Sequence, residues 1–252
     1  MPPILVGCCG WPIRRAEYFS RLKTVEINSA FYNLPLLSTA ERWRAEAPED
    51  FEFSLKAWQI ITHPASSPTY SKLRRKISEK ARTRYGGFRD TFEVSSAWER
   101  TLAVARALRA RFILFQTPSS FYPSSDHLRD MYRFFKGLPR GEFHYVWETR
   151  AESWRPTSLQ RTCEDLGLVH GVDPLVSEPL HGPVRYFRLH GRYDKGRLLY
   201  HHMYSDEQMS RLLDLCRGRH AYVYFNNFEM WRDAGRFERL ARESDVRSLR
   251  AL

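Results

Sequence analysis

The stretch FHYVWETR, residues 143–150, constrains the fold more than any other part of the chain. In a β-strand, successive side chains point to opposite faces, so one face carries His144, Val146, Glu148 and Arg150. The charged pair of that face lies only at its carboxyl end, whereas a strand at a protein surface would show polar groups along its whole outer face. Charge at this position is typical of the active-site mouth of a parallel β/α barrel.

Four further stretches repeat this alternation of apolar and polar residues and also end in polar side chains. They are Thr24–Asn28, Phe51–Trp58, Arg185–Gly191 and Ala221–Asn227. Near the ends of these strands, the polar side chains at the positions that face the inside of the barrel are Glu26, Lys56, Arg188, His190 and Asn226. We expect them to surround one cavity together with Glu148 and Arg150.

Strand-like and helix-like segments alternate along the whole chain, which predicts an α/β protein with a single (β/α)8 TIM-like barrel. The predicted strands cover residues 4–10, 24–32, 51–58, 111–118, 143–150, 168–173, 185–191 and 220–227. The predicted helices cover residues 39–48, 96–109, 126–138, 158–166, 205–217 and 233–243. A length of 252 residues suits one such barrel, so we predict one domain over residues 1–252, with an extended basic segment at about residues 59–100.

No apolar run reaches the length of a signal peptide or a bilayer span, which predicts a cytoplasmic protein without membrane contact. The net charge of +11 favours polyanionic partners, nucleic acid first. Much of this charge falls in one run: Lys72, Arg74, Arg75, Lys76, Lys80, Arg82 and Arg84. Two interpretations of the run stay open, a solvated helix face and a docking surface for nucleic acid.

The chain resembles the YecE-like family, also called domain of unknown function 72, in several stretches that together span nearly its whole length. They are GCCGW at 7–11, VEINSAFYNLP at 25–35, Lys56 with Thr62-His63, FQTPSSF at 115–121, WETRAESW at 147–154, RLHGR at 188–192 and YFNN at 224–227. The resemblance implies a TIM-like barrel with a shared polar mouth, and it supplies no reaction.

Two stretches depart from the family pattern. Cys8 and Cys9 stand where the family motif reads Gly-Thr-Ser-Gly-Trp, so a hydroxyl there is not essential to a shared chemistry. After Asn227 the segment FEMWRDAGRF replaces a small-residue stretch ending in Asn-Ala, which puts any role of that tail in doubt.

The charges at the strand ends predict a site for an anionic ligand such as a phosphate, because Lys56, Arg150 and Arg188 outnumber the carboxylates. The candidate catalytic residues are Glu148, Lys56, Glu26 and His190. The candidate substrate-binding residues are Asn28, Tyr32, His63, Gln116, Arg150, Trp154, Arg188, Asn226 and Asn227. A purely structural alternative pairs Glu26 with Arg188 and Glu148 with Lys56.

Other chemistries are open alternatives. Glu26, Glu148, Asp173 and His190 can be arranged as ligands of a divalent metal, although the neighbouring Lys and Arg would repel it. We therefore predict no metal ligand. Because no glycine-rich nucleotide loop and no G-x-S-x-G is present, we also predict no cofactor.

Several side chains have two readings. Cys8 and Cys9 can be nucleophiles or buried small hydrophobes; with Cys163 and Cys216 they form no C-x-x-C pair, which favours reduced thiols. His63 can line the mouth or cap a helix. The aromatic side chains that can stack a base, or simply pack, are Tyr32, Trp58, Phe121 and Trp154.

The function predicted from the sequence is an enzyme that acts by acid–base chemistry on a phosphate-bearing or otherwise anionic substrate, and nucleic acid or a fragment of it is one such substrate. Two alternatives remain: a nucleic-acid-binding protein without turnover, and a metal-dependent barrel nuclease or isomerase.

Overall fold

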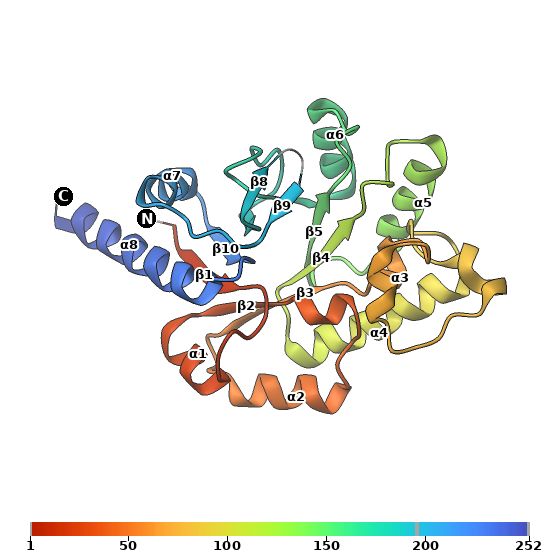
Figure 1. Ribbon diagram of the computed structural model, residues 1–252, viewed down its shortest axis with the longest axis horizontal. Helices are drawn as coiled ribbons and strands as arrows, with labels where there is room; N and C mark the ends of the chain where they lie inside the picture. The colour runs from red at the N-terminus through yellow and green to blue at the C-terminus, as the bar shows by residue number, and fades with distance from the viewer. Residues whose placement is uncertain (1, 195–196, 251–252) are drawn as a thin grey trace. The chain divides into compact units, whose positions relative to one another are not determined.

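The computed structural model describes residues 2–194 and 197–250 (Figure 1). The chain groups into two compact units. Unit 1 comprises Met1–Glu26, Ala47–Glu52 and Val169–Leu252, and unit 2 comprises Ile27–Glu46 and Phe53–Leu168. The expectation of a single domain stays a prediction.

Besides most of β2 (Thr24–Ile27), four parallel strands with almost entirely buried side chains belong to unit 1. They are β1 (Ile4–Cys8), β6 (Val169–Val172), β7 (Arg185–Leu189) and β10 (Ala221–Phe225). β1 pairs with β10, β10 with β7, and β7 with β6. All five residues of β10 are buried, which explains its nearly continuous apolar and aromatic sequence, because a parallel strand is covered on both faces.

The helices of unit 1 are α1 (Arg15–Arg21), α7 (Asp206–Cys216) and α8 (Met230–Arg250). A capping box fixes the start of α7: Ser205 Oγ accepts from the Gln208 backbone N–H, and the Gln208 side chain accepts from the Ser205 N–H. α8 packs against β1, β10 and α7 (Figure 1). α1 was not predicted from the sequence.

Unit 1 also contains an antiparallel hairpin of β8 (Arg192–Asp194) and β9 (Arg197–Leu199), which the sequence analysis missed. Gly191 precedes it with a φ of 119°, and a Cβ there would collide with the Leu199 carbonyl oxygen. Only glycine suits this position, because the conformation and the close backbone approach both exclude a side chain.

The strands β3 (Glu52–Lys56), β4 (Phe112–Thr117) and β5 (His144–Thr149) are parallel neighbours. They belong to unit 2, apart from Glu52. Tyr145 faces outward and packs against Trp98 and Phe115. The period-two assignment of Phe143–Arg150 is therefore confirmed for the outer face of β5.

The helices of unit 2 are α2 (Leu37–Glu46), α3 (Gln59–Thr62), α4 (Phe92–Leu108), α5 (Ser125–Lys136) and α6 (Pro156–Leu166). α4 starts earlier than the predicted residue 96, because Thr91 caps it by accepting from the Val94 N–H.

Two predictions of secondary structure were wrong. The second strand, β2 (Thr24–Ile27), does not reach Tyr32, because Asn28–Phe31 forms the 3-10 helix η1. Asn and Ser at its start favour a turn over an extended chain. The basic run is not one helix: it lies over the 3-10 helices η2 (Pro68–Lys72) and η3 (Glu79–Arg84) and the bends between them.

The eight main strands follow the hydrogen-bonded order β1-β10-β7-β6-β5-β4-β3-β2. Cys9 forms an isolated parallel bridge with Glu26 of β2, and this bridge links the two ends of the order. The predicted α/β class with a (β/α)8 TIM-like barrel is confirmed. No described helix combines the length and the hydropathy needed to cross a membrane.

Candidate functional site

A fully buried ion pair joins β2 and β7 within unit 1. Arg188 donates from Nε to Glu26 Oε2 and from Nη2 to Glu26 Oε1, both at 2.8 Å. Tyr186 Oη donates to the same Oε2 at 2.8 Å. Such bidentate geometry compensates the cost of burying both charges. The pairing of Glu26 with Arg188, which the structural alternative predicted, is therefore present.

His190 lies beside this ion pair at the carboxyl end of β7 and is buried. Its Nε2 is 3.4 Å from Arg188 Nη1, and its Nδ1 is 2.9 Å from the Asn226 side-chain amide. These two contacts place the His190 ring between the buried ion pair and the Asn226 side-chain nitrogen, Nδ2.

The second cluster lies in unit 2 at the carboxyl ends of β3, β4 and β5. Lys56 Nζ donates to Gln116 Oε1 at 2.9 Å, and Gln116 Nε2 donates to Glu148 Oε1 at 2.8 Å. Arg150 Nη2 lies 2.8 Å from the same carboxylate oxygen. We call Lys56, Gln116, Glu148 and Arg150 the Lys56–Glu148 cluster.

Strand register explains this cluster. Gln116 stands opposite Glu148 in the pairing of β4 with β5, and Lys56 stands opposite Leu114 in the pairing of β3 with β4. The sequence analysis paired Glu148 with Lys56, and the structure joins the two through Gln116. Lys56 and Glu148 are buried, whereas the Arg150 side chain is 26% exposed. The cluster is thus accessible from its Arg150 end.

The Lys56–Glu148 cluster carries two cations and one carboxylate. The Lys56 ammonium also lies 4.0 Å from the centre of the Phe31 ring, a cation–π contact. Ammonium and guanidinium groups held close together are the usual partners of phosphates and carboxylates in proteins. The arrangement therefore suits a phosphate or a carboxylate as ligand.

His63 adjoins the Lys56–Glu148 cluster and caps the end of α3. Thr62 Oγ1 lies 2.8 Å from His63 Nδ1, and the ring packs edge-on against Phe31. Burial, and secondarily the charge of Lys56, lowers the pKa of His63 to about 3. His63 is therefore neutral at physiological pH and suited to hydrogen bonding rather than to charge pairing.

Gln59, in the turn after β3, was missed by the sequence analysis. The side chain is fully buried, and its Nε2 donates to the Tyr32 carbonyl oxygen at 3.4 Å. Within the described residues, Gln59 Oε1 and Asn28 Oδ1 are buried without a donor. Buried acceptors are normally satisfied, so these two oxygens suit a ligand that carries N–H or O–H groups. The one feature of the sequence that could have indicated Gln59 is its place as a polar residue at the start of the mostly apolar segment QIIT.

Tyr32 and Trp154 lie in different surroundings of unit 2. The Tyr32 ring is half-buried, and the Lys72 ammonium lies 4.6 Å from its centre. Trp154 packs edge-on against Trp147 and stacks on Phe121, to whose carbonyl oxygen its Nε1 donates at 2.8 Å. Packing accounts for these contacts of Trp154.

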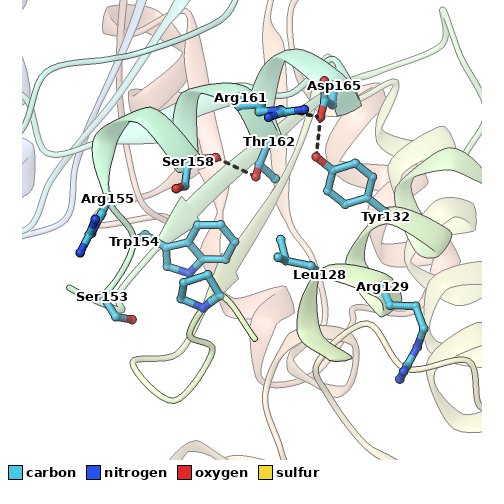
Figure 2. Close-up of a pocket in the computed structure, with 11 residues that line it drawn as sticks. Leu128, Arg129, Tyr132, Ser153, Trp154, Arg155, Ser158, Arg161, Thr162 and Asp165 are labelled. Atoms are coloured by element: carbon cyan, nitrogen blue, oxygen red, sulfur yellow. Dashed lines mark hydrogen bonds and ion pairs between the residues drawn. The ribbon is translucent and has the colours of Figure 1, made fainter. Parts of the chain in front are cut away.

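Trp154 also borders a groove of about 780 Å³ between α5 and α6 (Figure 2). Figure 2 shows Arg155 and Ser158 on the α6 side of the groove and Leu128 on the α5 side. Tyr132 Oη donates to Asp165 at 2.6 Å across it. Of the residues predicted for the site, only Trp154 lines this groove.

Asn227 lies in the connection between β10 and α8. Its Nδ2 donates to the His202 carbonyl oxygen and to Asp233 Oδ2, both at 2.7 Å. Asp233 is fully buried and also accepts from Arg236. These contacts hold the loop after β10 against α8.

The predicted site residues fall into two groups. Unit 1 holds Glu26, Arg188, His190, Asn226 and Asn227, and unit 2 holds Asn28, Tyr32, Lys56, His63, Gln116, Glu148, Arg150 and Trp154. Each unit brings its own charged residues together. One shared cavity for all of them stays a prediction.

The donor chemistry does not favour a metal ion. Among the described residues, no three His, Cys, Asp or Glu side chains are placed to hold one. Glu26 is bound to Arg188, and His190 lies against the same guanidinium, which would repel a divalent cation.

The side chains of all four cysteines are buried. Burial raises the pKa of Cys8 to about 12, so its thiol stays protonated and is a poor nucleophile. Cys8 and Cys9 are both buried, as one of the two interpretations expected, and the role of Cys9 stays a prediction.

Comparisons with known proteins agree with the fold and with the resemblance seen in the sequence. A solved DUF72 family protein from Enterococcus faecalis is similar with a TM-score of 0.68 and 22% identity, covering 95% of this chain and 98% of that chain. One from Thermotoga maritima has a TM-score of 0.66 and 19% identity, covering 94% and 98%. Endonuclease IV from Thermus thermophilus has a TM-score of 0.52 and 11% identity, covering 94% and 96%. At these identities the structural likeness shows the fold alone.

No curated protein matches the chain. The family model described as "Protein of unknown function DUF72" matches residues 12–249, nearly the whole sequence. The chain therefore belongs to the DUF72 family.

Proposed function

We propose that the protein is an enzyme that binds a phosphate-bearing or otherwise anionic substrate at the Lys56–Glu148 cluster. The observation that carries this proposal is that two cations and one carboxylate are brought together at the carboxyl ends of three parallel strands. This is the end of the strands at which barrel enzymes place their catalytic groups.

In this proposal Lys56 and Arg150 bind the anion, and Glu148 or Lys56 transfers the proton. Gln116 holds Lys56 and Glu148 at a fixed separation through its two hydrogen bonds. His63 offers a neutral hydrogen-bonding group beside them. Glu26 was expected to be catalytic, and in this proposal it has a positioning role instead. Both of its carboxylate oxygens accept hydrogen bonds from Arg188, and one also accepts from Tyr186. Glu26 thereby holds Arg188 in place beside His190.

Nucleic acid stands first among the phosphate-bearing substrates for two reasons. The net charge is +11, which attracts polyanions. An endonuclease is also among the solved structures that share the fold, which supports this substrate class as a proposal.

A second candidate function is nucleic-acid binding through the basic segment, Lys72 to Arg84. All seven of its cations are exposed. Of these, only Arg82 and Arg84 form ion pairs among the described residues, with Glu79 and Glu93. Arg74, Arg75, Lys76 and Lys80 thus remain available for phosphates, whereas the Lys72 ammonium lies against the Tyr32 ring. This function requires no turnover.

The anion site is tested with inorganic phosphate as the probe. Lys56→Met keeps most of the length of the side chain and removes its charge. We expect it to weaken phosphate binding by about 10-fold or more, the effect of one hydrogen bond to a charged group. Isothermal titration calorimetry measures the binding. Lys23→Met is the matched control, because Lys23 is exposed and pairs with Asp50. Equal phosphate affinity in the Lys56 and Lys23 variants would remove the basis of the proposal.

Binding through the basic segment is tested by its dependence on salt. Arg74→Ala, Arg75→Ala and Lys76→Ala together remove three cations, and each phosphate contact on a single strand contributes a slope of about −0.7 to log K against log salt. We therefore expect the slope to drop by about 2, measured by fluorescence anisotropy with a labelled oligonucleotide.

The matched control for this experiment removes the same charge from another exposed part of the chain, Arg211→Ala, Arg217→Ala and Arg219→Ala. An unchanged slope in the first variant, or the same drop in the control, would show that the basic segment is only a solvated surface.

A further inference from the structure

A groove of about 300 Å³ lies between the basic segment and the start of α4, both in unit 2. Arg75, Lys76 and Tyr85 line one side, and Phe92 and Glu93 of α4 line the other. Figure 1 shows the orange and yellow segment of η2 and η3 beside the start of α4, and η3 contacts that helix. The volume is at the lower end of the range for small-ligand pockets.

The two cations that line the groove form no ion pair with other described residues. Arg75 and Lys76 are exposed, and neither forms an ion pair there. By contrast, the nearby Arg100 guanidinium lies over the Trp58 ring at 5.0 Å. Arg75 and Lys76 are therefore the groups of the groove that suit a phosphate.

Phe92, the first residue of α4, is 81% exposed. The other aromatic side chains of the groove, Trp58 and Tyr85, are buried and form its wall. An exposed Phe ring beside cations offers a flat apolar surface on which a nucleobase can stack. A base inside a duplex has both faces covered by its neighbours, so only an unpaired base can use this ring.

Glu93 supplies the third part of the groove. Its Oε1 lies 3.5 Å from Arg84 Nη1, whereas Oε2 is buried and has no hydrogen-bond partner within the described part of the chain. The side chain is only 16% exposed. A buried carboxylate oxygen without a donor favours a ligand that carries N–H groups. The exocyclic amine of cytosine is such a donor, and Glu accepts from it.

We propose that this groove binds one unpaired nucleotide of a single-stranded nucleic acid. Its phosphate contacts Arg75 and Lys76, its base stacks on Phe92, and a base amine donates to Glu93. The inference rests on the second candidate function, binding through the basic segment, and it specifies the form of the nucleic acid. It is independent of catalysis at the Lys56–Glu148 cluster.

The experiment measures fluorescence anisotropy of labelled oligodeoxycytidine and of a duplex with Phe92→Ala. Phe92→Ala removes the stacking of the base on the ring, which contributes to the free energy of binding. We therefore expect the variant to bind the single strand about 5- to 150-fold more weakly. Duplex binding and phosphate binding at the Lys56–Glu148 cluster should be unchanged. Phe92→Trp should restore or strengthen single-strand binding. The side chain is exposed, so neither variant disturbs the core.

Tyr122→Ala is the matched control, because Tyr122 is another exposed aromatic residue of unit 2, at 55%. Wild-type single-strand affinity in Phe92→Ala would overturn the proposal, as would an equal loss for the duplex. Polyglutamate that competes as well as oligodeoxycytidine would also overturn it, because the groove would then accept any polyanion. If Phe92→Ala has no effect while the Arg74, Arg75 and Lys76 variant still lowers the salt slope, the basic segment binds nucleic acid without this groove.

Discussion

Arg188→Met is expected to destabilise the protein by about 3–5 kcal/mol, because it leaves the Glu26 carboxylate buried without its guanidinium. A loss of this size is a large part of the roughly 5–15 kcal/mol that stabilises a typical domain. The loss of stability is measured by unfolding the variant in urea and monitoring it with circular dichroism, and we expect a lower urea concentration at the midpoint of the transition. Met keeps most of the side-chain volume, so the missing charge accounts for the effect rather than a cavity.

Two variants serve as controls for this result. Arg217→Met removes an exposed ion pair with Asp214 and should leave the midpoint nearly unchanged. Combining Glu26→Leu with Arg188→Met should be less destabilising than Arg188→Met alone, because no unpaired charge remains buried. If Arg188→Met unfolds at the same urea concentration as Arg217→Met, the ion pair between β2 and β7 contributes little to stability.

The alternation of residues along the strands predicted much of the site. The period-two pattern placed Glu148 on the inner face of β5, and Gln116 opposite it completes a network with Lys56. It also placed Glu26 and Arg188 with the same parity, and they form the buried ion pair. The face to which each side chain of a strand points can be predicted from the sequence, because it depends only on the geometry of the strand backbone.

Pairing partners were less predictable, because they depend on the register between strands and on side-chain length. Lys56 reaches Glu148 through an amide, and Arg150, just past the end of β5, reaches the same carboxylate oxygen. Neither contact can be read from alternation within one strand.

Segments outside the strands were the hardest to predict. The turn at Asn28–Phe31 shortens β2, and the β8–β9 hairpin follows a glycine whose conformation the sequence does not reveal. Gln59 is buried at the start of α3, a helix of four residues, where a polar residue normally indicates exposure. In these places tertiary packing, rather than local pattern, decides the structure.

Glu148→Gln is expected to separate catalysis from binding at the Lys56–Glu148 cluster. If Glu148 transfers a proton, turnover should fall by about 10²- to 10⁴-fold, the usual contribution of a positioned acid or base. The amide is nearly the same size as the carboxylate and still accepts from Gln116 and Arg150. Phosphate binding should therefore persist and even strengthen, because the positive charge of Lys56 and Arg150 is no longer partly neutralised.

The measurement combines product formation from oligonucleotides and phosphate monoesters with calorimetric titration of inorganic phosphate. Glu142→Gln is the matched control, since Glu142 lies at the surface and pairs with Arg106. A parallel loss of phosphate binding and turnover in Glu148→Gln would assign Glu148 to holding the site together rather than to proton transfer. Absence of turnover in the wild-type protein, with oligonucleotide binding retained, would instead favour the binding function of the basic segment, because that function uses Arg74, Arg75 and Lys76 and needs no acid or base.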